Sequence, residues 1–596
     1  MLAGWSIGRP ALLIRDRMTT FSARYKFEAP LHMIRHLKIL AVSMLALVPS
    51  GPVFSEGLAG AYLAARQASI ESDYEAAARY FTMALAQDPS NPVLLDSAVA
   101  TYLGLGELES ALPIARKMRA DGLESQAGFM VLIANNIAAG DFGAVLNDYK
   151  DGHRIGPLVD GLVQSWALVG KGQMTEALTG FDEVTQIRGT RAFGLYHKAL
   201  ALALVGDYEG ADKILSGEAN GPLRATRSGV IAHIEILSQL ERNSDALELL
   251  DLIFEGNTEP GIAEMRAALE TGETLPFTQV SSAQDGITEV FFTVASVLSS
   301  EASPAYTLLY SRIAGFLSPD HEEALLLTAS ILERLERYEL ATEVYDQVPR
   351  DSFVYHIAEL GRSEALRNSG KPDAAIEVLM QLAESHSKLP IVHSTLGDTL
   401  RGLQRYAEAT EAYDRAIALF EEPERDQWIA FYSRGITRER ENRWDESEAD
   451  FRKALELNPG QPHVLNYLGY SLVEQKIKLD EALAMIEEAV AARPDDGYIV
   501  DSLAWALFRL GRYEEAIVHM ERAVELAPVD PIVSDHLGDV LWAVGRTRES
   551  EFQWRRAMSF NPEEKDAARI LRKLEIGLDA VLLEEGSEAL FVANDD

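Results

Sequence analysis

Three short stretches of the sequence carry residue types that could do chemistry. Residues 4–8 read Gly-Trp-Ser-Ile-Gly and match the G-x-S-x-G pattern of a hydrolase nucleophile, which needs a strand before the serine and a helix after it. His321 begins a His-Glu-Glu stretch that lacks the second histidine of a zinc protease. Lys171 lies in Val-Gly-Lys-Gly, which lacks the upstream glycine and the following hydroxyl residue of a phosphate-binding loop. We expect a protein without catalytic residues, and a hydrolase at Ser6 is the alternative.

Composition argues against bound metals, cofactors and nucleic acid. The chain of 596 residues has no cysteine, and its 12 histidines never cluster at the spacing of metal ligands. We therefore expect no metal site and no cofactor. The net charge of −37 comes from Glu and Asp residues scattered through the chain, and such a surface repels phosphate backbones and anionic lipids. This charge favours cationic or apolar protein segments as partners.

The start of the chain has the layout of a secretory signal. From Met33 a basic segment precedes an apolar run, Ile39 to Val48, and small residues then stand before Glu56. We expect translation to begin at Met33, which makes residues 1–32 an upstream extension and residues 33–55 a signal peptide. Cleavage would leave a periplasmic protein without stable membrane insertion. The alternative is an inner-membrane protein that keeps the apolar run as an anchor, although ten apolar residues are about half a bilayer crossing.

The predicted helices, which would have to position any functional site, recur along the chain with a regular period. One position, Ala in most repeats, recurs mostly at intervals of 34 residues, with one gap of 61 residues near the middle of the chain. Proline follows near the end of several repeats, as at Pro459, Pro494, Pro528 and Pro562. Because a proline disfavours helical geometry in the residue before it, each of these prolines is expected to end a helix. The recurring positions are Ala77, Ala111, Val145, Ala177, Ala211, Ala246, Thr307, Ala341, Ala375, Ala409, Ser447, Ala482, Ala516 and Ser550.

A period near 34 residues with a small residue in mid-repeat and a closing proline resembles the tetratricopeptide repeat, a helix–turn–helix unit. The resemblance implies an all-α fold, a right-handed superhelical solenoid of about fourteen repeats that is interrupted once near the middle. No helix pair buries its apolar face alone, so stability is expected to come from stacked neighbours. Residues 56–256 are the expected amino-terminal array, and residues 287–562 the carboxy-terminal array.

Residues 257–286 interrupt the period. Their composition predicts one short helix followed by an extended, turn-rich stretch around Pro276. Two interpretations fit this segment: a degenerate repeat, or a joint between two halves of the solenoid where a segment crosses the groove or flexes. Residues 563–577 are expected to form a capping helix over the last apolar face, and residues 578–596 a loose acidic tail.

The resemblance also places the binding groove. In this repeat family the first helix of each pair lines the concave face, at its second, fifth, ninth and twelfth positions. Those positions here hold aspartates and aromatic side chains, whereas chaperone-tail-binding members use lysine, arginine and asparagine to clamp a terminal carboxylate. The set suits a peptide with basic and apolar side chains, with aromatic anchors; the alternative is that Trp505 and Trp542 simply pack between helices. The expected groove residues are Asp398, Tyr432, Asn466, Tyr470, Tyr498, Asp501, Trp505, Asp535, Asp539 and Trp542.

The stretch from Asn466 to Ala516 resembles a recurrent block of long envelope repeat proteins in Gram-negative bacteria. Some of those proteins, usually lipid-anchored, are adaptors that bring substrates to carboxyl-terminal processing proteases. This chain has no cysteine for lipid attachment, so the resemblance implies a soluble periplasmic scaffold or protease adaptor. Such a protein binds other proteins or peptide segments and is not an enzyme. The alternative within this class is a helper of outer-membrane assembly or polysaccharide export.

Overall fold

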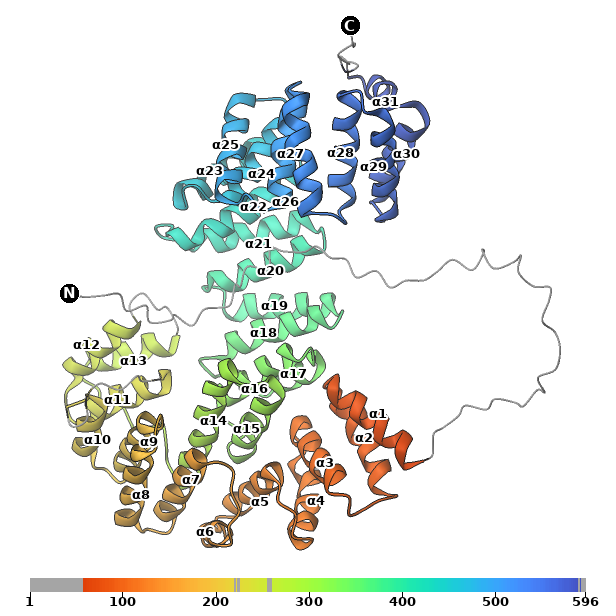
Figure 1. Cartoon of the computed structure of the whole chain (residues 1–596). Coiled ribbons are helices and arrows are strands. Elements are labelled where there is room, and N and C mark those ends of the chain that lie inside the picture. The colour runs from red at the N-terminus through yellow and green to blue at the C-terminus, as the bar shows by residue number, and fades with distance from the viewer. Residues whose placement is uncertain (1–56, 219–220, 222–225, 255–259, 588–589, 591–596) are drawn as a thin grey trace, which may run out of the picture. The chain divides into compact units, whose positions relative to one another are not determined.

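The part of the chain that the structure describes contains helices and no strand (Figure 1). The computed structural model describes residues 57–218, 221, 226–254, 260–587 and 590. The described residues from Gly57 onward belong to one compact unit. The expected upstream extension and signal peptide lie outside the described residues, and so does the hydrolase pattern at Ser6.

Six pairs of helices come before the interruption, and each pair is joined by a short turn. The pairs are α1 (Leu58–Ile70) with α2 (Tyr74–Leu85), α3 (Pro92–Leu105) with α4 (Leu108–Ala120), α5 (Gln126–Ala138) with α6 (Phe142–Lys150), α7 (Pro157–Gly170) with α8 (Met174–Gln186), α9 (Arg191–Leu204) with α10 (Tyr208–Leu215), and α11 (Arg227–Gln239) with α12 (Asn243–Phe254).

A single helix, α13 (Pro260–Glu270), separates these pairs from eight further ones. These are α14 (Ala283–Glu301) with α15 (Pro304–Leu317), α16 (Glu322–Arg334) with α17 (Tyr338–Tyr345), α18 (Tyr355–Asn368) with α19 (Pro372–Ser385), α20 (Pro390–Gly402) with α21 (Tyr406–Ala418), α22 (Trp428–Arg440) with α23 (Trp444–Leu457), α24 (Pro462–Glu474) with α25 (Leu479–Ala492), α26 (Gly497–Arg509) with α27 (Tyr513–Leu526), and α28 (Pro531–Ala543) with α29 (Thr547–Ser559). A 3₁₀ turn, η1 (Arg425–Gln427), precedes α22.

The recurring position of the sequence is the fourth residue of the second helix in all fourteen pairs, from Ala77 in α2 to Ser550 in α29. Each of these fourteen side chains has an exposed fraction of 0%. A small, fully buried residue lets the two helices of a pair approach closely. The repeat period of the sequence is therefore the period of the helix pairs, and the predicted all-α repeat solenoid is confirmed.

Small residues on the first helix make room for large ones on the second. A Cβ atom placed on Gly538 in α28 would lie 2.3 Å from Nε1 of Trp554 in α29. A Cβ atom on Gly435 in α22 would lie 2.7 Å from the ring of Phe451 in α23. Because protein interiors are closely packed, a larger residue at either glycine would force the helices of the pair apart.

The turns between repeats follow from proline and aspartate. Helix α27 ends at Leu526, two residues before Pro528, and α28 begins at Pro531. The side chain of Asp530 accepts hydrogen bonds from two backbone amides of the first turn of α28, at 2.8 and 2.9 Å. Such a cap satisfies amides that have no partner within the helix, and a proline at the first helical position needs none. The predicted helix ends thus agree with the structure at this turn.

After α13 the chain turns back across the amino-terminal pairs. Residues 271–282 form no helix, and α14 then begins at Ala283, inside the expected interruption 257–286. With 19 residues, α14 is the longest helix of the described chain. Helix α14 lies against α7 and α9, and α15 lies against α3 and α5. The pair α14–α15 therefore covers first helices of four earlier repeats.

The carboxy-terminal end carries two further helices. Helix α30 (Glu564–Ile576) falls within the expected capping segment, residues 563–577. Helix α31 (Leu578–Glu584) forms the first part of residues 578–596, which were expected to be a loose acidic tail. The difference arises because Leu578 and Val581 are buried, with exposed fractions of 0% and 3%, so this part of the segment has an apolar face.

Candidate peptide-binding surfaces

The first helices α3, α5, α7 and α9 of the amino-terminal pairs lie against α14 and α15. A Cβ atom placed on Gly286 of α14 would lie 2.3 Å from the indole of Trp166 in α7. Ile287 and Phe291 of α14 are fully buried, and they belong to one apolar core together with residues of α3, α5 and α7. The face that would line a peptide groove in these repeats is therefore an internal core of the chain.

Polar contacts at the same interface join residues far apart in the sequence. The side-chain amide of Gln126 in α5 donates to the hydroxyl groups of Tyr306 and Tyr310 in α15, at 2.9 and 3.1 Å. The hydroxyl of Tyr196 in α9 donates to Glu289 of α14 at 2.9 Å. Buried polar groups that are all paired fix one arrangement of the surrounding helices. A peptide could enter this face only by displacing these bonds.

A partly buried arginine anchors α15 to α3. Nε of Arg312 donates to the carbonyl oxygen of Gly104 at 3.1 Å. Burial lowers the pKa of Arg312 to about 10, and the nearby side chains of Tyr74 and Glu343 oppose that shift. Even so, the group stays positively charged at neutral pH. The amino-terminal face is thus closed by apolar packing and by a partly buried cation.

The ten expected groove residues of the carboxy-terminal array fall into three sets by burial. Five are buried, with exposed fractions of 1 to 7%: Tyr432, Asp501, Trp505, Asp535 and Asp539. Tyr498 has an exposed fraction of 57%. The remaining four are partly buried: Asp398, Asn466, Tyr470 and Trp542.

Asp501 is paired with a histidine of the next repeat. Nδ1 of His536 lies 3.0 Å from both carboxylate oxygens of Asp501. Burial alone would lower the pKa of His536, but the carboxylate of Asp501 raises it above its ordinary value. The ring of His536 also stacks on Trp505, with 4.0 Å between ring centroids. Asp501 and Trp505 therefore join α26 to α28, and His536 is the member that the sequence analysis missed.

Trp505 is further fixed through its indole nitrogen. Nε1 donates to Glu474 of α24 at 2.7 Å, and Arg509 donates to the same oxygen at 3.1 Å. Trp505 also stacks on Phe508, with 4.9 Å between ring centroids. The position of Trp505 thus matches the alternative in which this ring packs between helices.

Asp535 and Asp539 hold the capping helix. Nζ of Lys573 in α30 lies 2.7 Å from Asp535 and 2.6 Å from Asp539, and Lys573 itself has an exposed fraction of 1%. Nε1 of Trp554 donates to Asp539 at 2.9 Å. Burial, and then repulsion from Asp539, raises the pKa of Asp535 despite the lysine. Both aspartates are therefore occupied within the chain.

Two of the other candidates, Asp398 and Trp542, are also bonded within the chain, and Tyr470 is partly buried. Asp398 accepts from the hydroxyl of Tyr413 at 2.7 Å and from Arg401 at 3.2 Å, yet 42% of its side chain stays exposed. The indole of Trp542 donates to Asp579 at 3.0 Å. Burial raises the pKa of the Tyr470 hydroxyl, followed by the charge of Glu474. Asp398 and Tyr470 combine a fixed position with access to solvent.

Asn466 has a free acceptor, and Tyr498 is the most exposed of the candidates. Oδ1 of Asn466 is buried and has no hydrogen-bond partner in the described structure. The ring of Tyr498 at the start of α26 is more than half exposed. A buried acceptor without a partner is costly unless a ligand or water satisfies it. These two residues lie on the first helices of neighbouring repeats.

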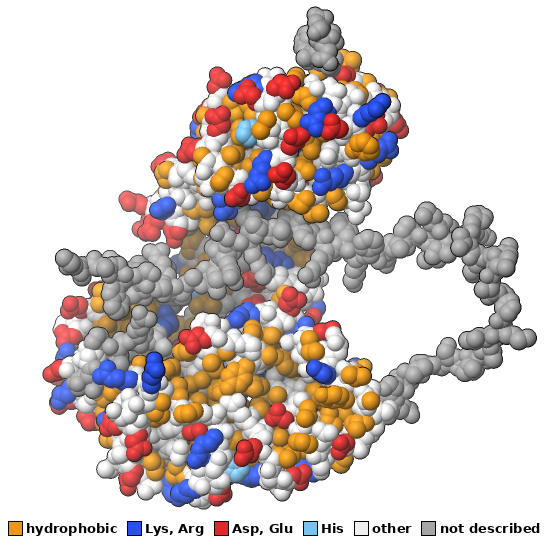
Figure 2. All heavy atoms as spheres, viewed as in Figure 1, with side chains coloured by type: hydrophobic (Ala, Val, Ile, Leu, Met, Phe, Trp, Pro, Cys, Tyr) orange, Lys and Arg blue, Asp and Glu red, His pale blue; other side chains and the backbone are white. Residues whose placement is uncertain are grey.

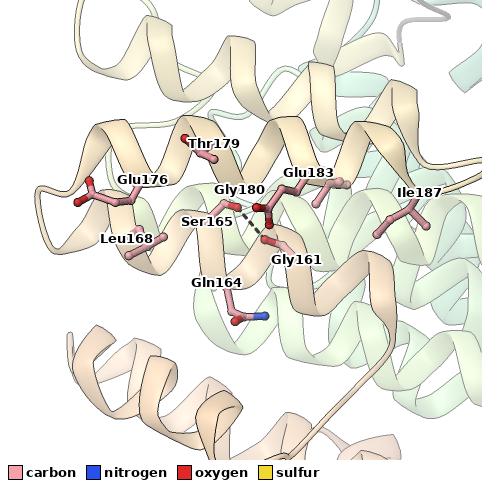
Figure 3. A pocket seen from close by; sticks show the side chains of 10 residues that line it. Gly161, Gln164, Ser165, Leu168, Glu176, Thr179, Gly180, Glu183 and Ile187 are labelled. Carbon is pink, nitrogen blue, oxygen red and sulfur yellow. Dashed lines mark hydrogen bonds between the residues drawn. The ribbon is translucent and has the colours of Figure 1, made fainter.

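A second hollow lies between α7 and α8, away from the predicted residues (Figure 3). It has a volume of about 480 Å³. Its lining includes Gly161 and Gly180 as well as the carboxylates Glu176 and Glu183. Ser165 Oγ donates to the carbonyl oxygen of Gly161 at 2.8 Å and so is already satisfied. The charged side chains of the lining are therefore both acidic.

The described residues give no support to metal chemistry or to a membrane span. Among them, no group of three or more histidine or carboxylate side chains could hold a metal ion. His321 is instead the cap of α16, where its Nδ1 accepts from the amide of Ala324 at 3.2 Å. None of the described helices is both long and apolar enough to cross a bilayer. Figure 2 shows acidic and basic side chains interspersed over the visible face.

Comparison with known proteins gives the repeat family. Residues 394–462 and 468–531 match the family model of the tetratricopeptide repeat. A stretch of 174 residues is 26% identical to a TPR repeat-containing protein of Pseudomonas aeruginosa and covers 29% of this chain. The matched part spans only 28% of the length of that relative.

Several solved structures are similar to this chain. A chain of the APC/C hetero-tetramer Cut9–Hcn1 is 13% identical over 87% of this chain and 96% of its own, with a TM-score of 0.35. Yeast Tom70 is 14% identical over 89% of this chain and 96% of its own, with a TM-score of 0.33. YrrB, a TPR protein with an unusual peptide-binding site, is 18% identical over 33% of this chain and 99% of its own, with a TM-score of 0.26. The matched family segments, the period of the sequence and the paired helices together identify the chain as a tetratricopeptide-repeat protein.

Proposed function

We propose that this chain is a protein-interaction scaffold whose carboxy-terminal array binds an extended peptide along the first helices α20, α22, α24 and α26. The observation that carries the proposal is the contrast between the two halves. The first helices α3, α5, α7 and α9 of the amino-terminal array are covered by α14 and α15. On α20, α24 and α26, by contrast, Asp398, Asn466, Tyr470 and Tyr498 keep accessible surface. This carboxy-terminal set offers side chains to a partner without unfolding a core.

The chemistry of this row favours a peptide with basic and apolar side chains. Asp398 and Glu474 keep 42% and 40% of their side chains exposed, and the chain as a whole has a net charge of −37. The rings of Tyr470 and Tyr498 suit apolar or cationic side chains. The partly exposed amide side chain of Asn466 suits a hydrogen bond with the backbone of the peptide.

Site-specific photo-cross-linking tests the surface. A photo-reactive residue in place of Tyr498 should capture a protein partner in cells, and Tyr498→Ala should weaken that complex. The matched control is Val518, which has an exposed fraction of 65% but lies on the second helix α27. Equal capture from positions 498 and 518 would argue that the first-helix face is not the site.

We further propose that the scaffold works in the bacterial envelope, as a periplasmic adaptor for a carboxyl-terminal processing protease. The support is the layout of residues 33–55 and the resemblance of the block from Asn466 to Ala516. Mass spectrometry of the tagged protein should find an amino terminus near Glu56 and a co-purified envelope protease. Capture of a β-barrel protein, or a defect in an exported polymer, would favour the assembly or export helper. A protein that keeps residues 39–48 would instead be anchored in the inner membrane.

A further inference from the structure

An extended segment of the chain lies on α11 in the manner of a bound peptide. We name residues 273–280, Glu-Thr-Leu-Pro-Phe-Thr-Gln-Val, the strap. The backbone amide of Leu275 donates to Oγ of Ser238 at 2.9 Å, and the carbonyl oxygen of Leu275 accepts from the side-chain amide of Gln239. Two neighbouring side chains of α11 thus bond both main-chain groups of one strap residue.

The second half of the strap is held by Glu235, one turn earlier on α11. The backbone amide and the hydroxyl of Thr278 donate to the two carboxylate oxygens of Glu235, at 2.9 and 2.6 Å. The side chain of Gln279 adds a longer bond of 3.4 Å. Glu235 has an exposed fraction of 4%, and its hydrogen bonds in the described structure all go to the strap. No other role accounts for a carboxylate at this buried position.

The first half of the strap is tied to α12 as well. The side-chain amide of Asn243 donates to the carbonyl oxygen of Glu273 at 2.9 Å. Oγ of Ser238 donates to the side-chain oxygen of the same Asn243 at 2.8 Å. Ser238 and Asn243 therefore form one hydrogen-bonded chain that fixes the acceptor and donor groups facing the strap.

The strap itself has the conformation of an extended ligand. Its side chains alternate: Leu275, Phe277 and Gln279 are partly buried, and Thr274, Pro276 and Thr278 are exposed. The ring of Phe277 lies edge-on to Tyr208 of α10, with 6.4 Å between ring centroids. No backbone–backbone hydrogen bond holds the described residues from Thr274 to Val280. Hydrogen bonds from side chains of α11 and α12 hold this stretch, together with the Phe277 ring, the packing of Leu275 on the α11–α12 core and the burial of Val280 at its end.

We infer that this face of α11 and α12 is a recognition site for an extended peptide, which the chain fills with its own strap and which a partner peptide of the same chemistry can occupy in its place. The ligand has a proline, an aromatic residue directly after it, and a threonine or serine next. The proline has no backbone N–H and therefore needs no acceptor on the site. The aromatic ring would pack on Tyr208 as Phe277 does, and the hydroxyl would donate to Glu235 as Thr278 does. This inference does not depend on the carboxy-terminal groove.

Because the strap is covalently part of the chain, it lowers the apparent affinity of the site for a free peptide. A segment tethered at both ends competes with a free peptide at an effective concentration on the order of millimolar. In the wild-type chain a free peptide should therefore bind weakly. Once the strap can no longer bind, the same peptide should bind at least tenfold more tightly.

The test uses full-length protein and a fluorescein-labelled synthetic peptide with the sequence of residues 273–280. The strap variant carries Leu275→Gly, Phe277→Gly and Thr278→Gly, which keep the chain length. Fluorescence anisotropy should show at least tenfold tighter binding to this variant than to the wild type. A peptide with valine in the place of Thr278 should bind the variant at least tenfold less tightly, because it loses the hydroxyl bond to Glu235.

Two further variants locate the site. Glu235→Ala, added to the strap variant, should abolish peptide binding, whereas Glu248→Ala on the exposed side of α12 should leave it unchanged. A strap variant with wild-type helicity that binds the peptide no better than the wild type would overturn the inference. So would binding that survives Glu235→Ala.

Hydrogen exchange of the wild-type protein provides a second test, in case the strap variant does not fold. The amides of Leu275 and Thr278 should exchange at least tenfold faster than the amides of α11 and α14, because the strap opens without unfolding its neighbours. If the strap amides exchange together with α14, the segment is a permanent joint and not a replaceable ligand.

Discussion

His197 is a residue whose role follows from burial alone. Its side chain has an exposed fraction of 0%, and Nδ1 accepts from the indole of Trp166 at 3.1 Å. Because desolvation disfavours the charged imidazolium, burial lowers the pKa of His197 to about 3. The ring is thus a neutral acceptor that orients Trp166 in the core shared by α7 and α14. Among the described residues, His197 belongs to no group of three or more histidine or carboxylate side chains that could hold a metal ion.

This shift predicts a loss of stability in acid. The folded state keeps His197 neutral, whereas the unfolded chain takes up a proton near pH 6.5. The contribution of neutral His197 to the free energy of unfolding is therefore complete above pH 6.5. It falls by about 1.4 kcal/mol per pH unit as the pH drops toward 3. Urea unfolding at several pH values should show this slope in wild type and lose it in His197→Gln, which keeps an acceptor for Trp166. Parallel pH curves for the two proteins would contradict the assignment.

Lys573 is the second residue with a large expected effect. Its removal would leave the buried carboxylates of Asp535 and Asp539 without their cation. We expect Lys573→Met to destabilise the carboxy-terminal repeats by about 3–5 kcal/mol, measured by denaturant unfolding. The matched control is Lys565→Met, an exposed position on the same helix. The loss should shrink in acid, because the raised pKa of Asp535 lets that group take up a proton.

At the scale of elements, the contact between α14 and α7 leaves no room for a side chain at Gly286. Gly286→Ala would place a methyl group 2.3 Å from the Trp166 ring, and overpacking of this kind costs about 1–3 kcal/mol. Gly315→Ala in α15 is the matched control, because a Cβ atom there meets nothing within 4 Å. That exchange should stabilise its helix by roughly 0.5–1 kcal/mol. Thermal unfolding of both variants gives the comparison, and equal midpoints would show that the ring moves aside freely.

The pairing of elements could be predicted from the sequence, because it depends on local spacing. The position that begins with Ala77 marks the second helix of each of the fourteen pairs. The bond between Asp501 and His536 spans 35 residues, close to one period, so a search for pairs one repeat apart would have found it. The contact of α14 with α7 leaves no such trace, because it depends on how the whole array curves. The hydrogen bonds between Thr278 and α11 leave no trace in the sequence either, because they also depend on how the array curves.

The candidate site was predicted only in part. Tyr498 and Asp398 keep accessible surface, but Asp535, Asp539 and Trp505 are bonded within the chain. Position numbers within a repeat place a side chain on the first helix and on its concave side. They do not show whether the next repeat or the capping helix already covers that side chain. Burial by neighbours is a property of the assembled array.

At the scale of the whole molecule, substitutions of core residues and of exposed groove residues should have different effects, the first on stability and the second on partner binding. Trp505→Ala removes a stacked, buried ring and should cost about 3–5 kcal/mol of stability. Tyr498→Ala changes an exposed ring and should alter stability by less than about 0.5 kcal/mol while weakening the partner complex. Denaturant unfolding and partner capture, run on both variants, check the two effects. A combined Tyr470→Ala and Trp505→Ala variant should show lost stability as well as lost binding, because Trp505 belongs to the core.

Because α15 packs on α3, the amino-terminal half can finish folding only after α15 has been synthesised. Arg312 and its acceptor Gly104 are separated by 208 residues. A chain that emerges from its amino terminus at about 5–20 residues per second needs on the order of tens of seconds to cover that separation. During that time the first helices of the early repeats show their apolar faces to solvent. Carboxy-terminal pairs, whose bonds reach only one repeat ahead, can instead close as they appear. The amino-terminal half is therefore where nascent chains of this protein most need a chaperone.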